Sequence, residues 1–292
     1  SSVALGNNAG NSSQGVNAVA VGLVAGKTTQ GDYAVAVGNG AGQTSQGTQA
    51  ISVGLSAGGV TQGNNSIAVG VNAGADTQGT VSVAVGEGAG QTTQGISAVA
   101  VGRSAGKTTQ GDYGVAVGRD AGNTTQGTFA TAVGSGAGTT SQGAQSVAIG
   151  YVAGQSSQGI NSVAVGVNAG KTSQGDTSVA IGQLAGEINQ GANGIIISST
   201  GATLNNTVVG HIEIRSTGGF LLMDGATGNW SSSGTTGTVS DIRLKENINP
   251  ITDALSKVNT LNGITFSYKE NGTVATGLIA QDVQEVLPEA VF

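Results

Sequence analysis

The chain has 292 residues, of which 9% are charged and 3% aromatic, with 53 glycines, 2 prolines and no cysteine. So few aromatic side chains argue against an ordinary globular core, and the lack of cysteine excludes a disulfide framework. The formal charge of −6 is spread along the sequence without a basic stripe, so nucleic acid is not expected as a partner. No apolar run reaches membrane-spanning length, and membrane insertion is not expected either.

A sixteen-residue repeat fills the first two thirds of the sequence. Glycine recurs in twelve copies from Gly6 to Gly182, and the pairs Ala9-Gly10 and Gln14-Gly15 recur in the same register. A fixed period of this size is typical of solenoids, in which each unit buries its apolar side only against the next. Disordered linkers share this composition, but they do not hold several columns in phase. We therefore predict a mainly β protein, a β-solenoid or β-roll of twelve coils over residues 1–191.

Each repeat contains one short strand and a set of turns. In the run from Ala18 to Val21 small and branched residues alternate, as a strand requires, and the Ala-Gly-x-Thr-Thr-Gln-Gly segment is turn material. We expect the Val or Ile side of the strand to fill the coil interior. The other side, which is Ala in the middle position of every copy except Ser52, is expected to pack on a second and a third copy of the chain. A coil with two branched residues buries too little apolar surface to offset its ordering entropy alone, so a homotrimer is predicted.

Residues 192–239 break the period and read as irregular short strands, a β-rich tip or cap. His211 is the only histidine and has no second ligand candidate nearby, so a structural role is favoured and no metal or cofactor is expected. Two interpretations of Trp230 stay open: a platform that stacks on a sugar and a packing residue. Aromatic residues also occur in the variable loops of the repeats and are candidates for receptor contact: Tyr33, Tyr113, Phe129 and Tyr151.

A third region begins at Ser240, where charged residues become frequent and a small α+β module is predicted. Asn249-Pro250 is a helix start signal and is followed by apolar residues at helical spacing. Strands are expected at residues 264–268 and 274–280, with a short helix to Leu287.

Three blocks in this region carry a resemblance: Ser240 to Ile248, Gly277 to Val283, and Leu287-Pro288-Glu289. Together they resemble the C-terminal intramolecular chaperone of phage tail fibres and tailspikes, peptidase family S74, over residues 240–292. The resemblance implies a virion tail-fibre location facing the host, a folding helper that drives trimerisation, and a bacterial surface glycan or outer-membrane receptor as partner. The repeats look like the head repeats of YadA-like trimeric adhesins.

The same resemblance implies self-cleavage between Val239 and Ser240, once per chain after assembly. Ser240 would be the nucleophile and Lys245 its base, while Asp241 and Arg243 would shape the loop. A lysine accepts a serine proton only when its pKa is lowered by burial or by a neighbouring cation, which Arg243 would supply. A solvated, charged linker is the other interpretation of this stretch.

Two further functions compete with a tail-fibre segment. The head region of a bacterial trimeric surface adhesin, without proteolysis, would show the same repeats. A glycan-degrading tailspike needs a pair of carboxylates in a groove, and acidic residues are sparse in the repeats, which indicate no turnover enzyme. The repeat is already under way at Ser1, and the family module usually extends beyond the Pro-Glu block, so we expect the sequence to be a segment of a longer protein.

Overall fold

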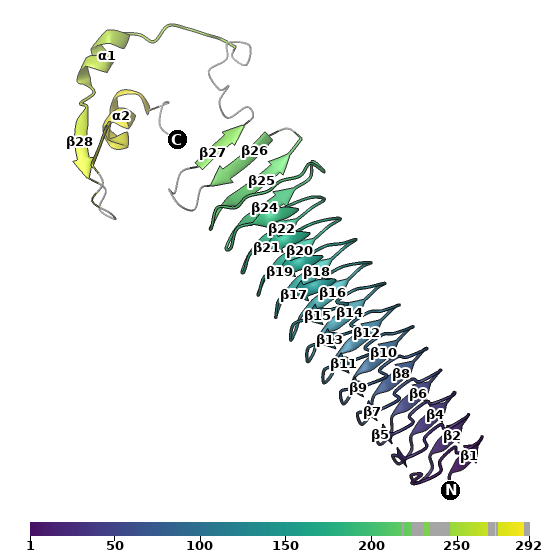
Figure 1. The fold of residues 1–292 in the computed structure, drawn as a ribbon. Helices are drawn as coiled ribbons and strands as arrows, with labels where there is room; N and C mark the ends of the chain where they lie inside the picture. The colour runs from purple at the N-terminus through teal and green to yellow at the C-terminus, as the bar shows by residue number, and fades with distance from the viewer. Residues whose placement is uncertain (218, 224–229, 234–245, 268–271, 273, 289–292) are drawn as a thin grey trace. The chain divides into compact units, whose positions relative to one another are not determined.

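The computed structural model describes residues 1–217, 219–223, 230–233, 246–267, 272 and 274–288. The chain forms two compact units, residues 1–237 and 238–292, which are described separately. In the first unit short strands stack turn upon turn from β1 to β24, in the purple to green part of Figure 1.

Two sheets run along this stack. The larger has sixteen strands: β1 (Val3–Leu5), β2 (Val19–Val21), β4 (Val35–Val37), β6 (Ile51–Val53), β8 (Ile67–Val69), β10 (Val83–Val85), β12 (Val99–Val101), β14 (Val115–Val117), β16 (Thr131–Val133), β18 (Val147–Ile149), β20 (Val163–Val165), β22 (Val179–Ile181), β24 (Ile195–Ser198), β25 (Ile212–Ser216), β26 (Gly219–Met223) and β27 (Trp230–Ser233). The smaller has eleven: β3 (Thr29–Gln30), β5 (Ser45–Gln46), β7 (Thr61–Gln62), β9 (Thr77–Gln78), β11 (Thr93–Gln94), β13 (Thr109–Gln110), β15 (Thr125–Gln126), β17 (Thr140–Gln142), β19 (Ser156–Gln158), β21 (Thr172–Gln174) and β23 (Ile188–Gln190).

Neighbouring turns pair in parallel and in register with the sequence period. Val83 lies beside Val99, sixteen residues later, and the same spacing links each pair from β1 to β24. The pairing continues one strand further with a seventeen-residue step, from Ile195 to Ile212. The predicted fold class, a mainly β solenoid of sixteen-residue coils, is therefore confirmed.

The predicted assignment of the two strand faces is wrong. Ala84 and Ala100 are 0% exposed and line the coil interior, whereas the flanking Val83 and Val85 are only half-buried on the outer face. The interior holds alanine because two short sheets joined by tight corners enclose a narrow space, and buried glutamine side chains fill the remainder. From β2 to β22 the branched side chains therefore face outward, whereas in β24 Ile196 takes the inward position and is 0% exposed.

A buried glutamine ladder ties the two sheets together. Gln110 is 1% exposed, and its Nε2 donates to the carbonyls of Val99 at 2.8 Å and Gly114 at 3.1 Å. Gln94 Nε2 donates to Gln110 Oε1 at 3.1 Å, which links successive turns. The bond from glutamine to the carbonyl eleven residues earlier recurs in every turn from Gln14 to Gln190. The glutamine side chains thus provide hydrogen-bond donors for carbonyl groups inside the coil, which alanine side chains cannot do.

The single serine in the alanine column fits this ladder. Ser52 Oγ accepts a hydrogen bond from Gln46 Nε2 at 3.2 Å and donates one to Gln62 Oε1 at 2.6 Å. Its hydroxyl is 0% exposed yet fully satisfied, so the substitution of Ser for Ala does not leave an unpaired polar group in the core.

Gln110→Ala is expected to lower the free energy of unfolding by about 2–4 kcal/mol, because buried carbonyls lose their donor and a cavity remains. Denaturant unfolding followed by circular dichroism measures this. Gln91→Ala is the matched control, since the Gln91 side chain is half-buried and makes no hydrogen bond to described residues. Equal unfolding midpoints for the two variants would contradict a structural role of the ladder.

Beyond β25 the strand pairing becomes antiparallel. β25 pairs antiparallel with β26, and β26 with β27. His211, just before β25, is 7% exposed, and neither ring nitrogen has a hydrogen-bond partner among the described residues. Within the described ranges, no group of three or more His, Cys, Asp or Glu side chains is placed to hold a metal ion.

The second unit has two short helices and a hairpin: α1 (Ala254–Thr260), β28 (Ile264–Ser267), β29 (Val274–Gly277) and α2 (Ala280–Val286). Helix α1 begins at Ala254, later than the predicted start at Asn249-Pro250, because Asp253 takes a left-handed conformation with φ of 54°. The second strand ends at Gly277, three residues before its predicted end. In the part of the chain that the structure describes, no helix combines the length and apolar character needed to cross a bilayer.

Candidate functional site

The residues predicted to perform self-cleavage lie outside the described ranges. These are Val239, Ser240, Asp241, Arg243 and Lys245. Their roles therefore stay predictions that rest on the sequence.

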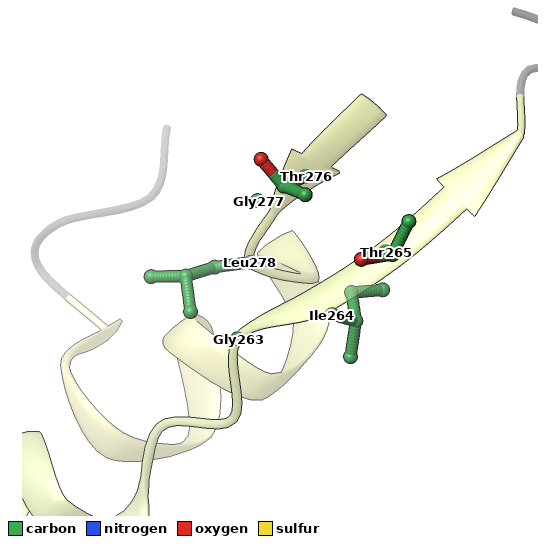
Figure 2. Close-up of a pocket in the computed structure, with 6 residues that line it drawn as sticks. All are labelled: Gly263, Ile264, Thr265, Thr276, Gly277 and Leu278. Carbon is green, nitrogen blue, oxygen red and sulfur yellow. The ribbon is translucent and has the colours of Figure 1, made fainter. Parts of the chain in front are cut away.

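The described part of the second unit leaves its apolar side chains uncovered. Neither α1 nor α2 contains a buried residue, and Leu255 on α1 is 75% exposed and Val258 57% exposed. A pocket of about 370 Å³ lies beside the hairpin, between the start of β28 and the end of β29 (Figure 2), and its lining has no titratable side chain: Gly263, Ile264, Thr265, Thr276, Gly277 and Leu278. Such a surface fits association with other chains better than chemistry of its own.

A stripe of branched residues runs along the outer face of the large sheet. We call it the valine stripe: the first and third residues of each strand from β2 to β24, beginning with Val19 and Val21 and ending with Ile195 and Ile197. At about 4.8 Å between strands the stripe is about 50 Å long. Ile149 is 40% exposed and Ile181 38%, while most other members are half-buried. A continuous apolar surface of this extent marks an interaction site.

The outer face of the small sheet has the opposite character. It carries exposed hydroxyl side chains such as Thr93 and Thr109 in β11 and β13. The two outer faces therefore differ in polarity. Covering the outer face of the large sheet with another chain is favourable because it removes apolar surface from water, and the hydroxyl face of the small sheet offers no such gain.

The aromatic residues chosen from the sequence are exposed, at two positions of the repeat. Tyr33, Tyr113 and Phe129 share one position, are 51–57% exposed and all have φ of 58–59°. The rings of Tyr113 and Phe129 stack with centroids 4.8 Å apart and an angle of 3° between their planes. Bulky side chains rarely adopt left-handed backbone. The same repeat position is left-handed in turns without an aromatic residue, as at Asn17 and Val81, so this geometry belongs to the corner of the repeat.

The other two aromatic candidates lie elsewhere. Tyr151 is 56% exposed and lines a pocket on a different edge of the coil. Trp230 begins β27 and pairs with Met223, but its side chain is outside what the structure describes. The structure thus brings Tyr113 together with Phe129 and leaves Tyr33 and Tyr151 apart from them.

Comparison with known proteins identifies the two parts of the sequence separately. Residues 240–292 match the family model described as Peptidase_S74, chaperone of endosialidase. Two stretches of the repeats, residues 126–153 and 157–185, match the model described as YadA head domain repeat. Both resemblances inferred from the sequence are therefore confirmed.

Curated relatives point the same way over a short stretch. The chain is 49% identical over 57 residues to the long tail fiber protein Gp37 of Enterobacteria phage K3, which covers 18% of this chain and 5% of that protein. The protein of the same name in Enterobacteria phage T2 is also 49% identical over 57 residues, with 18% and 4% covered. The chain thus spans a small fraction of the curated relatives it matches. No solved structure matches significantly.

Sequence reasoning missed two features of the YadA-like repeats. The glutamine ladder was assigned to turns, although a polar residue that recurs without change at a repeat position, from Gln14 to Gln190, signals a buried structural role. It also missed that Arg103 and Arg119, sixteen residues apart, fall on adjacent turns of one column.

Proposed function

We propose that this chain is a structural, host-binding segment of a bacteriophage tail fibre, a homotrimer whose S74-type module sets the register of the rod and then cleaves itself off. The observation that carries the proposal is the pairing of an S74 match at residues 240–292 with a repetitive rod. The similarity to tail fiber proteins supports a place in the virion tail, outside the host cell. The proposed divisions are the rod at 1–191, the tip at 192–239 and the module at 240–292.

A rod of near-identical turns needs such a helper. Turns with the same columns can pair one unit out of register at little free-energy cost, and three chains multiply the wrong alignments. The exposed apolar side chains of Leu255 and Val258 support a module that completes its core only when three copies meet. After release of the module the rod would persist because its unfolding barrier is high.

The proposed cleavage uses the residue that follows the scissile bond. Lys245 takes the proton of Ser240 Oγ, which attacks the carbonyl of Val239. The peptide C–N bond breaks, the amine of Ser240 takes up a proton, and Val239 is left as an ester on Ser240 Oγ. Water then hydrolyses the ester, giving the Val239 carboxylate and restoring the Ser240 hydroxyl.

Denaturing electrophoresis and intact mass measurement test this cleavage. The wild type is expected to lose a fragment corresponding to residues 240–292, whereas Ser240→Ala and Lys245→Ala stay full length because the nucleophile or its base is missing. Lys257→Ala, on α1, is the matched lysine control and should cleave like the wild type. Identical full-length products from all four chains would reject self-cleavage.

The second candidate is the head region of a bacterial trimeric surface adhesin without proteolysis, which the YadA head repeat matches favour. Uncleaved trimers of the wild-type chain would support it. For host attachment, the exposed aromatic side chains of Tyr33, Tyr113 and Tyr151 are the proposed contacts in the rod, with Trp230 in the tip, and a bacterial surface glycan or outer-membrane receptor is the proposed partner.

A further inference from the structure

One column of the repeat gathers charged and aromatic side chains on four successive turns. Its members are spaced by sixteen residues, and the strands that precede them pair in register, so they lie one above the other: Arg103, Arg119, Ser135 and Tyr151. The other eight members of this column are apolar, amide or acidic residues such as Leu55, Asn39 and Glu87, and none of them is basic. Two adjacent arginines are therefore a local departure from the repeat.

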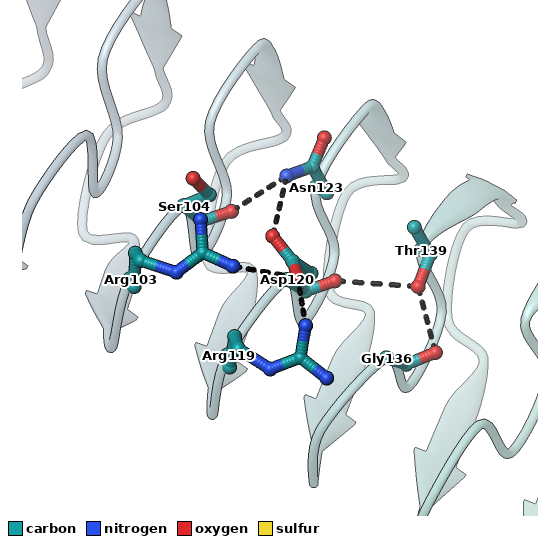
Figure 3. Close-up of polar contacts among 7 residues, drawn as sticks. All are labelled: Arg103, Ser104, Arg119, Asp120, Asn123, Gly136 and Thr139. Carbon is teal, nitrogen blue, oxygen red and sulfur yellow. Dashed lines mark hydrogen bonds and ion pairs between the residues drawn. The ribbon is translucent and has the colours of Figure 1, made fainter.

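The two arginines are held together by one carboxylate. Arg119 NH1 lies 2.9 Å from Asp120 Oδ2, and Arg103 NH2 lies 3.5 Å from the same oxygen (Figure 3). Asn123 Nδ2 donates to the carbonyl of Ser104 at 3.0 Å and contacts Asp120 Oδ1 at 3.5 Å. The arginine side chains are 54% and 56% exposed, against 26% for Asp120. Most guanidinium N–H groups thus remain free to bind an anion in a fork geometry.

The charge at this point is positive. Arg103 and Arg119 share a single carboxylate, and Lys107 follows on the same turn as Arg103. Glu87 precedes Arg103 in the column but forms no ion pair with it among the described contacts. Of the five basic residues in the rod, three therefore fall within residues 103–119, in a chain with formal charge −6.

Next to the arginines one turn carries only small side chains. Ser135 stands in the column between Arg119 and Tyr151, and a pocket of about 300 Å³ lies beside Ser135 and Gly136, lined also by Val152 and Gln155. Arg119 and Tyr151 are two turns apart, about 9.6 Å at the spacing of paired strands. A saturated sugar ring placed between Arg119 and Tyr151 would be in van der Waals contact with both side chains, at about 4 Å from each.

We propose that this pocket binds an anionic pyranose, a sugar ring that carries a carboxylate or a phosphate group. The oxyanion would lie on the guanidinium group of Arg119, which lines the pocket together with Asp120, and one face of the ring would stack on Tyr151. Arg103 does not line the pocket, but the Asp120 carboxylate holds its guanidinium group next to that of Arg119. Asn123 and Thr139 line the pocket and offer polar atoms to the ring hydroxyls. The inference rests on the proposed host attachment and names the ligand class that one part of the rod takes.

The rest of the rod offers an internal comparison. Around Leu55 the same column carries Asn39 on one adjacent turn and Val71 on the other, so this stretch lacks both charge and a ring. An anion has a reason to bind beside Arg119 and none beside Leu55.

Saturation-transfer NMR titrations of the full chain test the proposal, with glucose 6-phosphate, glucuronate, methyl glucoside and inorganic phosphate as probes. At least one of the two anionic sugars is expected to bind saturably, and the pair distinguishes phosphate from carboxylate. Arg119→Gln should weaken that binding at least tenfold, because a charge-assisted contact is lost. Tyr151→Ala should weaken sugar binding at least threefold and leave inorganic phosphate unchanged. Leu55→Ala is the matched control and should bind like the wild type.

Three results would overturn the proposal. They are no saturable binding of either anionic sugar, equal affinity in Arg119→Gln, and binding of inorganic phosphate as tight as that of the sugars in both wild type and Tyr151→Ala. Light scattering on each variant confirms that assembly is unchanged. Adsorption to host cells is measured separately: if the wild-type rod fails to adsorb, host attachment is rejected, while the sugar titrations still decide the pocket.

Discussion

Gly102→Ala is expected to destabilise the rod by at least about 3 kcal/mol, the largest effect predicted for a single methyl group in this chain. A Cβ at this position would lie 2.6 Å from the carbonyl oxygen of Gly118 on the next turn and 2.8 Å from its carbonyl carbon. Both are backbone atoms of a paired turn, so neither can move without breaking the register. Gly102 also has φ of 127°, which L-residues rarely adopt.

Gly88→Ala is the matched control for this prediction. Gly88 also has a positive φ, of 65°, but its added Cβ would meet nothing closer than Gln91 Oε1 at 3.5 Å. Left-handed backbone alone costs about 1–2 kcal/mol for alanine, and Ser56 and Asp120 occupy the same repeat position with φ of 54° and 57°. Thermal unfolding followed by circular dichroism compares the two variants, and equal midpoints would show that close stacking at Gly102 is not what requires glycine.

The period of the sequence was enough to predict the architecture because each turn pairs only with its neighbours. Columns spaced by sixteen residues, such as Gly86 and Gly102, must lie one above the other once the turns stack in parallel. A local rule of this kind needs no knowledge of distant contacts. The small α+β module was predicted from other signals, the frequent charged residues after Ser240 and the helix start at Asn249-Pro250.

The orientation of the strand faces could not be read from alternation alone. A period of two separates Val83 and Val85 from Ala84 but does not say which side is inside. Side-chain volume suggested the valines, yet the interior is so narrow that alanine and glutamine fill it. The missing information was the width of the coil interior, which depends on how the two sheets face each other and not on the alternation within one strand.

The candidate binding residues were predictable in part for a similar reason. Exposed loop aromatics such as Tyr113 stand out in a chain with few rings, whereas the cluster of Arg103, Arg119 and Asp120 becomes visible only when residues are aligned by column. Asp120 also contacts two turns at once, through Arg103 before it and through Thr139, whose hydroxyl donates to the Asp120 carbonyl at 3.3 Å. Contacts between turns of this kind depend on side-chain direction at the corner, which the sequence does not specify.

The corrected orientation also moves the expected trimer interface from the alanine column to the valine stripe. Val101→Asp combined with Val117→Asp is expected to convert the proposed trimer to monomers, because a carboxylate covered by another chain loses its hydration at a cost of several kcal/mol. Both positions are half-buried and face outward in the single chain. The fold of each chain should therefore survive, with its β signal in circular dichroism unchanged.

Sedimentation velocity and light scattering measure this change in assembly. Thr109→Asp combined with Thr125→Asp is the matched control, since it places two carboxylates on adjacent turns of the small sheet, where the threonines are exposed. The control should remain a trimer because its carboxylates stay in water. If instead the control dissociates and the valine variant does not, the interface lies on the hydroxyl face of the small sheet. The valine stripe would then be rejected as the surface that joins the chains.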